Sequence, residues 1–224
     1  MIGYIDSSSF PVYTYGEMMI SSPVSPVSKY YIWWTPSNIS SGTFTMEGST
    51  YNFSDYSGSF EFEGGIIQDR AFDYTGSIQT INTNAKEIGY YAFDCCFPLA
   101  QVSLPDCISI GVGAFADCKL LTQISLPVCL YIGDRAFYNC SSLTQISLPV
   151  CSYIGYSAFY NCSLLNTITL GSSSDCNILE SLVFNKTGIT SSTGSIFVPS
   201  SLVSVYKSTL YWSYFSKRIY PINN

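Results

Sequence analysis

Cysteines are the most regularly spaced reactive side chains in this 224-residue sequence, which contains nine of them. From Cys96 to Cys162 a cysteine recurs every 11 residues. Thiols so placed could form disulfides, hold a soft metal ion or act as nucleophiles. Nucleophilic catalysis is not expected, because the chain has no histidine that could serve as the base.

The cysteine spacing resolves into two interleaved ladders, each with a step of 22 residues. The first ladder is Cys96, Cys118, Cys140 and Cys162, and the second is Cys107, Cys129 and Cys151. The odd count and strict period favour buried free thiols that pack as small apolar groups. Disulfides, the usual state outside the cell, are an alternative. A soft-metal site is another, although no C-x-x-C pair is present. We therefore predict structural cysteines, with neither a metal nor a cofactor.

Tyrosines form a second regular set. Tyr131 and Tyr153 are 22 residues apart, and so are Tyr138 and Tyr160. Tyrosine combined with serine is the composition of antibody paratopes. The predicted ligand-binding residues of this set are Tyr131, Tyr153, Tyr138, Tyr160, Tyr156, Tyr91, Asp134 and Arg135. Alternatively, these rings fill grooves between neighbouring coils and expose only their hydroxyl groups.

The elements that must position these side chains are repeats of 22 residues. An Ala-Phe pair recurs at this step, and Ile-Gly and Leu-Pro pairs keep the same step. The phenylalanines of the regular copies are Phe93, Phe115, Phe137 and Phe159. Imperfect copies precede them at Phe72 and follow them at Phe184, giving four regular and two imperfect coils over residues 66–190. This period falls within the range of leucine-rich repeats.

Each copy contains the alternating pattern LTQISLP or a variant of it, which predicts a short strand ended by proline. The Ile-Gly step turns the chain, and we expect glycine to supply freedom in φ there. The following x-x-Ala-Phe-x-x-Cys predicts a short helical or 3₁₀ turn. The expected fold is a leucine-rich repeat solenoid with a parallel β ladder. Its outward strand positions form an uncharged face that includes Gln123 and Gln145, two further candidate binding residues.

The full pattern L-x-x-I-x-L-P…I-G-x-x-A-F-x-x-C resembles the BspA-type leucine-rich repeat family, which occurs in gut bacterial surface proteins and in related phage-encoded proteins. The resemblance implies a surface-exposed, non-enzymatic binding protein, and it does not fix a ligand.

The two ends of the chain do not follow the repeat. We expect residues 1–65 to form a β-rich N-terminal cap or attachment segment, with antiparallel strands at GTFTMEG and GSFEFEG and with Trp33 and Trp34 in its core. Residues 191–224 are expected to form a C-terminal cap. It would contain a strand at IFVP, a helix with Ser200 or Ser201 as its N-cap, and a last strand at KRIYPI.

Composition narrows the function classes. The net charge is −6 and only 11% of residues are charged, so binding of nucleic acid is not expected. No apolar stretch approaches the length of a transmembrane helix. No spaced carboxylate pair suggests an enzyme. The first hypothesis is an extracellular or cell-surface adhesion module that binds a host or bacterial protein or glycan. The alternative is a phage virion tail or fibre protein that binds a bacterial receptor, possibly as a homo-oligomer. The absence of a recognisable secretory signal in the opening residues favours this alternative.

Overall fold

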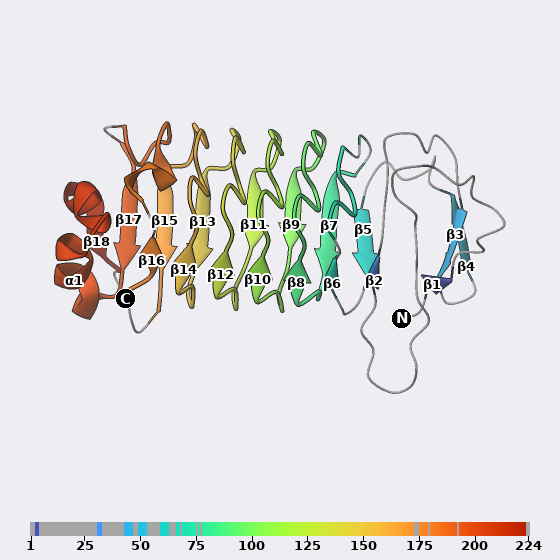
Figure 1. Ribbon diagram of the computed structural model, residues 1–224, viewed down its shortest axis with the longest axis horizontal. Helices are drawn as coiled ribbons and strands as arrows, with labels where there is room; N and C mark the ends of the chain where they lie inside the picture. Colours follow the sequence, from blue (N-terminus) through green and yellow to red (C-terminus); the bar gives the residue numbers. More distant parts are fainter. Residues whose placement is uncertain are drawn as a thin grey trace.

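The chain forms a right-angled coil of short strands stacked along one axis (Figure 1). The computed structural model describes residues 66–222, except 68, 75, 77, 173–174, 179 and 192. It also describes five strands nearer the N-terminus. Two kinds of parallel ladder run along this axis, so each coil crosses one short and one longer strand.

The first ladder is a seven-stranded parallel sheet, called here the short-strand sheet. Each strand is two residues long and begins one copy after its neighbour. In the regular copies the second residue is the isoleucine of the Ile-Gly pair, and these isoleucines lie in register. The strands are β2 (Tyr31–Ile32), β6 (Ile66–Ile67), β8 (Glu87–Ile88), β10 (Ser109–Ile110), β12 (Tyr131–Ile132), β14 (Tyr153–Ile154) and β16 (Asn177–Ile178).

The longer strands form the second ladder, called here the long-strand face. Their apolar residues point inward and the polar residues between them point outward, as the alternation predicts. The first four strands are β5 (Ser59–Phe62), β7 (Thr80–Thr83), β9 (Gln101–Ser103) and β11 (Gln123–Ser125). The next four are β13 (Gln145–Leu148), β15 (Thr167–Leu170), β17 (Ser195–Val198) and β18 (Ile219–Pro221).

The N-terminal strands confirm one expectation and correct another. Strand β3 (Thr43–Met46), in GTFTMEG, pairs antiparallel with β1 (Gly3–Tyr4) and with β4 (Ser49–Asn52), as predicted. Strand β5, in GSFEFEG, instead pairs parallel with β7. Alternation alone cannot distinguish these pairings, and here Phe60 continues the row of apolar positions through Ile81. Trp33 and Trp34 lie outside the described residues.

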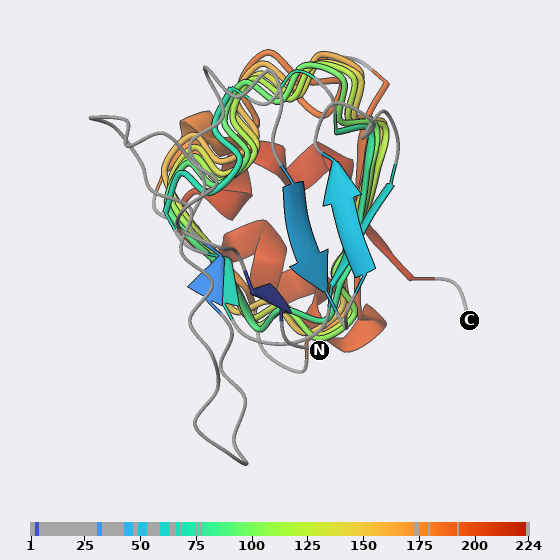
Figure 2. The same cartoon turned by 90° about the vertical axis from the view of Figure 1, so that its right-hand side faces the viewer.

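The core is a stack of phenylalanine rings, one from each coil. Consecutive rings from Phe72 to Phe184 have centroids 5.0–5.7 Å apart. All of them are almost fully buried, and the alanine before each regular phenylalanine is fully buried. Figure 2 shows that the coils superimpose closely down the axis, so each ring lies on the one before it.

The glycines of the Ile-Gly pairs serve close approach between coils and not a special φ. A Cβ on Gly133 would lie 2.7 Å from the carbonyl carbon of Gly111 in the previous coil. Gly111 and Gly155 are similarly crowded, and none of the three has a left-handed φ. The prediction that these glycines supply freedom in φ was therefore wrong.

Left-handed backbone instead occurs at two other positions in each regular coil, mostly on residues that carry side chains. One follows the pattern of Arg135 (φ 54°) and the other that of Asn139 (φ 60°). A helix cannot contain such residues. The predicted helical turn is accordingly a run of hydrogen-bonded turns in the regular coils. It becomes a 3₁₀ helix at η3 (Ser181–Phe184).

The buried thiols bond to backbone carbonyls. In the ladder from Cys96 to Cys162, each Sγ donates to a phenylalanine carbonyl of the preceding coil at 2.8–3.0 Å. In the second ladder, each Sγ donates to a carbonyl two residues later at 3.2–3.3 Å. Cys176 extends this ladder, with its Sγ 3.9 Å from that of Cys151. All nine cysteines are free thiols, and eight of them are buried.

The last segment covers the end of the phenylalanine stack. It consists of η4 (Ser200–Leu202), α1 (Val203–Ser208), η5 (Trp212–Arg218) and the predicted final strand, β18. Trp212 and Phe215 are buried against Phe184. Neither Ser200 nor Ser201 is the N-cap, because the turn begins directly after Pro199 and includes both serines. Proline fixes φ there at −52°, a value already suited to a turn.

Candidate functional site

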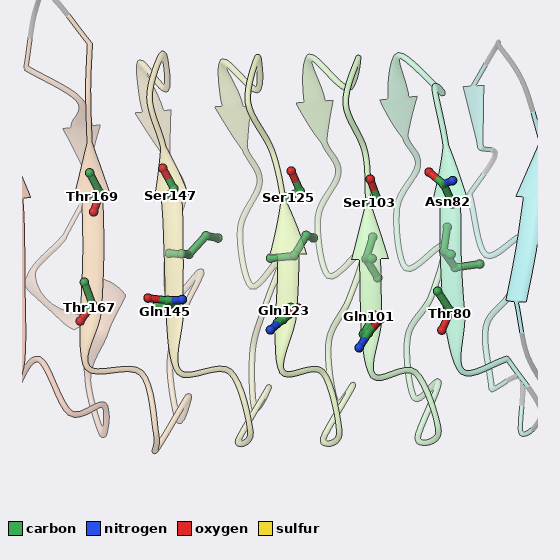
Figure 3. A pocket seen from close by; sticks show the side chains of 14 residues that line it. Thr80, Asn82, Gln101, Ser103, Gln123, Ser125, Gln145, Ser147, Thr167 and Thr169 are labelled. Atoms are coloured by element: carbon green, nitrogen blue, oxygen red, sulfur yellow. The ribbon is translucent and has the colours of Figure 1, made fainter.

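The long-strand face carries a shallow groove of about 700 Å³ that crosses five successive strands (Figure 3). No charged side chain lines it. Its floor includes Ile81, Val102, Ile124 and Ile146, which are at most 9% exposed. Its outward side chains are Thr80, Asn82, Gln101, Ser103, Gln123, Ser125, Gln145, Ser147, Thr167 and Thr169.

The groove repeats the same chemistry from one coil to the next. Gln101 and Gln123 lie in register on adjacent strands, as do Ser103 and Ser125. Figure 3 shows the glutamines in one row and the serines in another. Amide and hydroxyl groups both donate and accept hydrogen bonds. The surface therefore offers regularly spaced, uncharged hydrogen-bonding groups along the axis.

The predicted tyrosine pairs stack on each other across coils. The centroids of Tyr131 and Tyr153 are 4.6 Å apart with rings 1° from parallel, and those of Tyr138 and Tyr160 are 5.3 Å apart. Stacking in this way occupies ring faces that a ligand would otherwise contact. Burial, followed by the charges of Tyr131 and Asp134, raises the pKa of Tyr153 to about 12.

The other predicted residues of the turns divide into two kinds. Asp134 and Tyr91 contact neighbouring coils: Asp134 Oδ1 accepts a hydrogen bond from the backbone N–H of Tyr156 at 2.8 Å, and Arg70 lies 5.2 Å above the Tyr91 ring. Tyr156 and Arg135 are exposed. Asp134 therefore aligns the next coil, while Tyr156 and Arg135 remain accessible.

The ten predicted binding residues do not form one site. Gln123 and Gln145 line the groove, whereas Tyr131 and Tyr153 belong to the short-strand sheet on a different side of the coil. The remaining six lie on the turns that follow the short strands. Their roles in binding stay predictions, and the groove unites only two of them.

The ladder cysteines are poor nucleophiles in this environment. Burial raises the pKa of the Cys107 thiol to about 12 and that of Cys118 well above its usual range. Cys95 is partly exposed, and burial followed by the Asp94 charge raises its pKa to about 11. Sequence reasoning missed the surroundings of Cys95, because that residue lies off both ladders. The signal was the acidic residue directly before it, Asp94, and Asp117 one coil later.

Comparison with known families agrees with this geometry. A model of the BspA type leucine rich repeat region matches six copies, over residues 4–94, 37–150 and 86–217. The chain belongs to the BspA-type leucine-rich repeat family. The expected solenoid is thereby confirmed, and this BspA-type repeat protein falls among proteins that serve in general as binding modules.

Solved structures support the same fold. This BspA-type repeat protein is similar to a leucine-rich repeat protein from Bacteroides ovatus, with 22% identity and a TM-score of 0.57. The match covers 74% of this chain and 42% of that one, so the chain spans less than half of its relative. A leucine rich cell surface protein from Faecalibacterium prausnitzii is 20% identical over 75% of this chain and 57% of its own, with a TM-score of 0.39. Comparison with curated proteins gives no match. No helix in the described part of the chain is long and apolar enough to cross a bilayer.

Proposed function

We propose that this BspA-type repeat protein is a non-enzymatic binding module, displayed outside the cell, that holds a neutral glycan along the groove of the long-strand face. The observation that carries this proposal is the uncharged lining of the groove, maintained across five strands by side chains that both donate and accept hydrogen bonds. Its volume lies within the usual range for ligand sites.

The lining favours a glycan over a protein as the ligand. Energetically dominant residues in protein interfaces are mostly Trp, Tyr and Arg. The groove contains none of these, and its apolar floor is nearly inaccessible. Sugar hydroxyl groups, in contrast, can exchange hydrogen bonds with every glutamine, serine and threonine along it. The absence of charge in the groove also favours neutral over sulfated or carboxylated sugars.

A binding panel tests this proposal. Labelled protein is offered neutral polysaccharides, sulfated and sialylated glycans, purified matrix proteins and intact gut bacteria. Saturable binding to a neutral glycan, with little dependence on salt, is the expected result. Binding confined to proteins or to anionic glycans would contradict the proposal. Binding confined to a narrow set of bacterial strains, and not inhibited by neutral glycans, would support the virion alternative instead.

A further inference from the structure

The side chains of Asp94, Cys95 and Asp117 converge on the turns of two adjacent coils. One potential ligand atom from each residue lies within 4.8 Å of the other two, and all three side chains are half-buried. The Cys95 Sγ lies 3.6 Å from Oδ1 of Asp94, to which it donates. Two carboxylates and one thiol therefore face each other across a space comparable to a metal coordination sphere.

A buried carboxylate beside this cluster lacks a full set of partners. Asp73 is 9% exposed, and its Oδ1 accepts no hydrogen bond from any described residue, although Oδ2 pairs with Arg70 at 3.0 Å. The backbone N–H of Tyr74 donates to the carbonyl of Asp94 at 2.7 Å, so Asp73 and Asp94 occupy equivalent positions in adjacent coils. A buried carboxylate oxygen with no donor is costly unless a cation is nearby.

The electrostatics of Asp94 agree with this arrangement. Burial, followed by the charge of Asp73, raises the pKa of Asp94 to about 6, and Asp117 raises it further. The cluster thus gathers more negative charge than Arg70 and Lys119, its two basic neighbours, balance.

Cys95 also differs from every other cysteine in the chain. It belongs to neither ladder and is the one cysteine that is partly exposed, so its thiol is accessible while the other eight are buried. It occupies a left-handed position (φ 56°), as Asp117 does one coil later (φ 57°). Equivalent backbone conformations bring the two side chains out of the same part of the turn.

We propose that Asp94, Cys95 and Asp117 bind one divalent transition-metal ion of the zinc type, with the free oxygen of Asp73 as a fourth ligand. A thiolate with carboxylates suits Zn²⁺, whereas Ca²⁺ and Mg²⁺ prefer oxygen ligands alone. As the metal–sulfur bond forms, the Cys95 thiol releases its proton to solvent. The ion would link three consecutive coils where the imperfect first copy meets the regular array.

Titration of the full chain with Co²⁺ tests this proposal, because thiolate coordination gives a charge-transfer band in the near ultraviolet. We expect a saturable band at one Co²⁺ per chain, release of one proton per ion, and loss of the band when Zn²⁺ is added. Cys95→Ser should abolish the band. Asp117→Asn should weaken Co²⁺ affinity by at least the roughly 10-fold that loss of an outer-sphere partner costs. Circular dichroism verifies that each variant is folded.

The matched control is Asp106→Asn, which removes an exposed carboxylate paired with Lys86 and should leave Co²⁺ affinity unchanged. If Cys95→Ser does not fold, Asp94→Asn serves in its place, with weakening of affinity by the same factor as the criterion. Absence of saturable binding, or a band of equal intensity in Cys95→Ser, would overturn the proposal.

Discussion

The side-chain amide of Asn161 donates to Oδ1 of Asn139, 22 residues earlier, at 2.6 Å. Asn139 in turn donates to Oδ1 of Asp117 one coil before. All three residues have a left-handed backbone, with φ between 57° and 61°. Asparagine and aspartate tolerate this conformation better than other residues with side chains. One position therefore supplies both the turn geometry and a hydrogen-bonded ladder between coils.

Replacement of Asn139 separates these two contributions. Asn139→Gly removes the hydrogen bonds to Asp117 and Asn161 but keeps the left-handed conformation accessible. Asn139→Ala removes the hydrogen bonds and also places a Cβ at φ 60°. We expect Ala to lower the free energy of unfolding by about 1 kcal/mol more than Gly does. Urea denaturation of the two variants measures the difference, and equal losses would show that the backbone conformation contributes nothing.

The phenylalanine stack should dominate stability. Phe137 is fully buried between Phe115 and Phe159, so Phe137→Ala should cost about 3–5 kcal/mol. Leu120→Ala, at a side chain 55% exposed, should stay within about 0.5 kcal/mol of the parent. Chemical denaturation compares the two. Similar losses at both positions would mean that the rings do not form the core.

Close approach between coils makes the Ile-Gly glycine intolerant of a methyl group. Gly133→Ala would place Cβ 2.7 Å from the Gly111 carbonyl carbon, and we expect a loss of about 1–3 kcal/mol from the forced displacement. Gly76→Ala is the matched control, because nothing lies within 4 Å of its added Cβ. Thermal unfolding should leave the Gly76 variant at or above the parent midpoint. A Gly133 variant with an unchanged midpoint would contradict the packing of adjacent coils.

The stacked tyrosines should titrate late. The pKa of Tyr153 is raised from 10.0 to about 12, chiefly by burial, so the neutral phenol is favoured in the folded state. Stability from this group is therefore complete below pH 10 and is lost as the pH rises through about 12. Phenolate absorbance of the parent should show a late-ionising tyrosine that is missing from Tyr153→Phe. Loss of an early-ionising tyrosine in that variant would contradict the burial of Tyr153.

The sequence was sufficient to predict the solenoid, because the period and the alternation directly specify which side chains point inward. Phe115 and Ile132 lie where the repeat predicts them. The role of Gly133 could not be predicted, because glycine in a turn suggests a special φ and only the distance between coils reveals the crowding. The parallel pairing of β5 was likewise inaccessible, since alternation is the same for both strand directions.

The candidate site was predicted only in part. Gln123 and Gln145 were recognised as outward residues of a uniform face, and the structure shows that this face is hollowed. Sequence variability drew attention to the tyrosines instead. The 22-residue period of Tyr131 and Tyr153 reflects a stack between coils, which occupies ring faces. A periodic aromatic residue in a solenoid thus satisfies packing first.

Titration calorimetry with the neutral glycan that binds in the panel tests the central claim most directly. Ser125→Tyr places a bulky ring in the middle of the groove at an exposed position, and Tyr131→Ser/Tyr153→Ser alters the short-strand sheet elsewhere on the coil. We predict that Ser125→Tyr weakens binding by at least about tenfold, equivalent to about 1.4 kcal/mol. The double tyrosine variant should bind as the parent does. Undiminished binding by Ser125→Tyr, with loss of binding in the double variant, would show that the ligand lies on the tyrosines and that the groove is not the site.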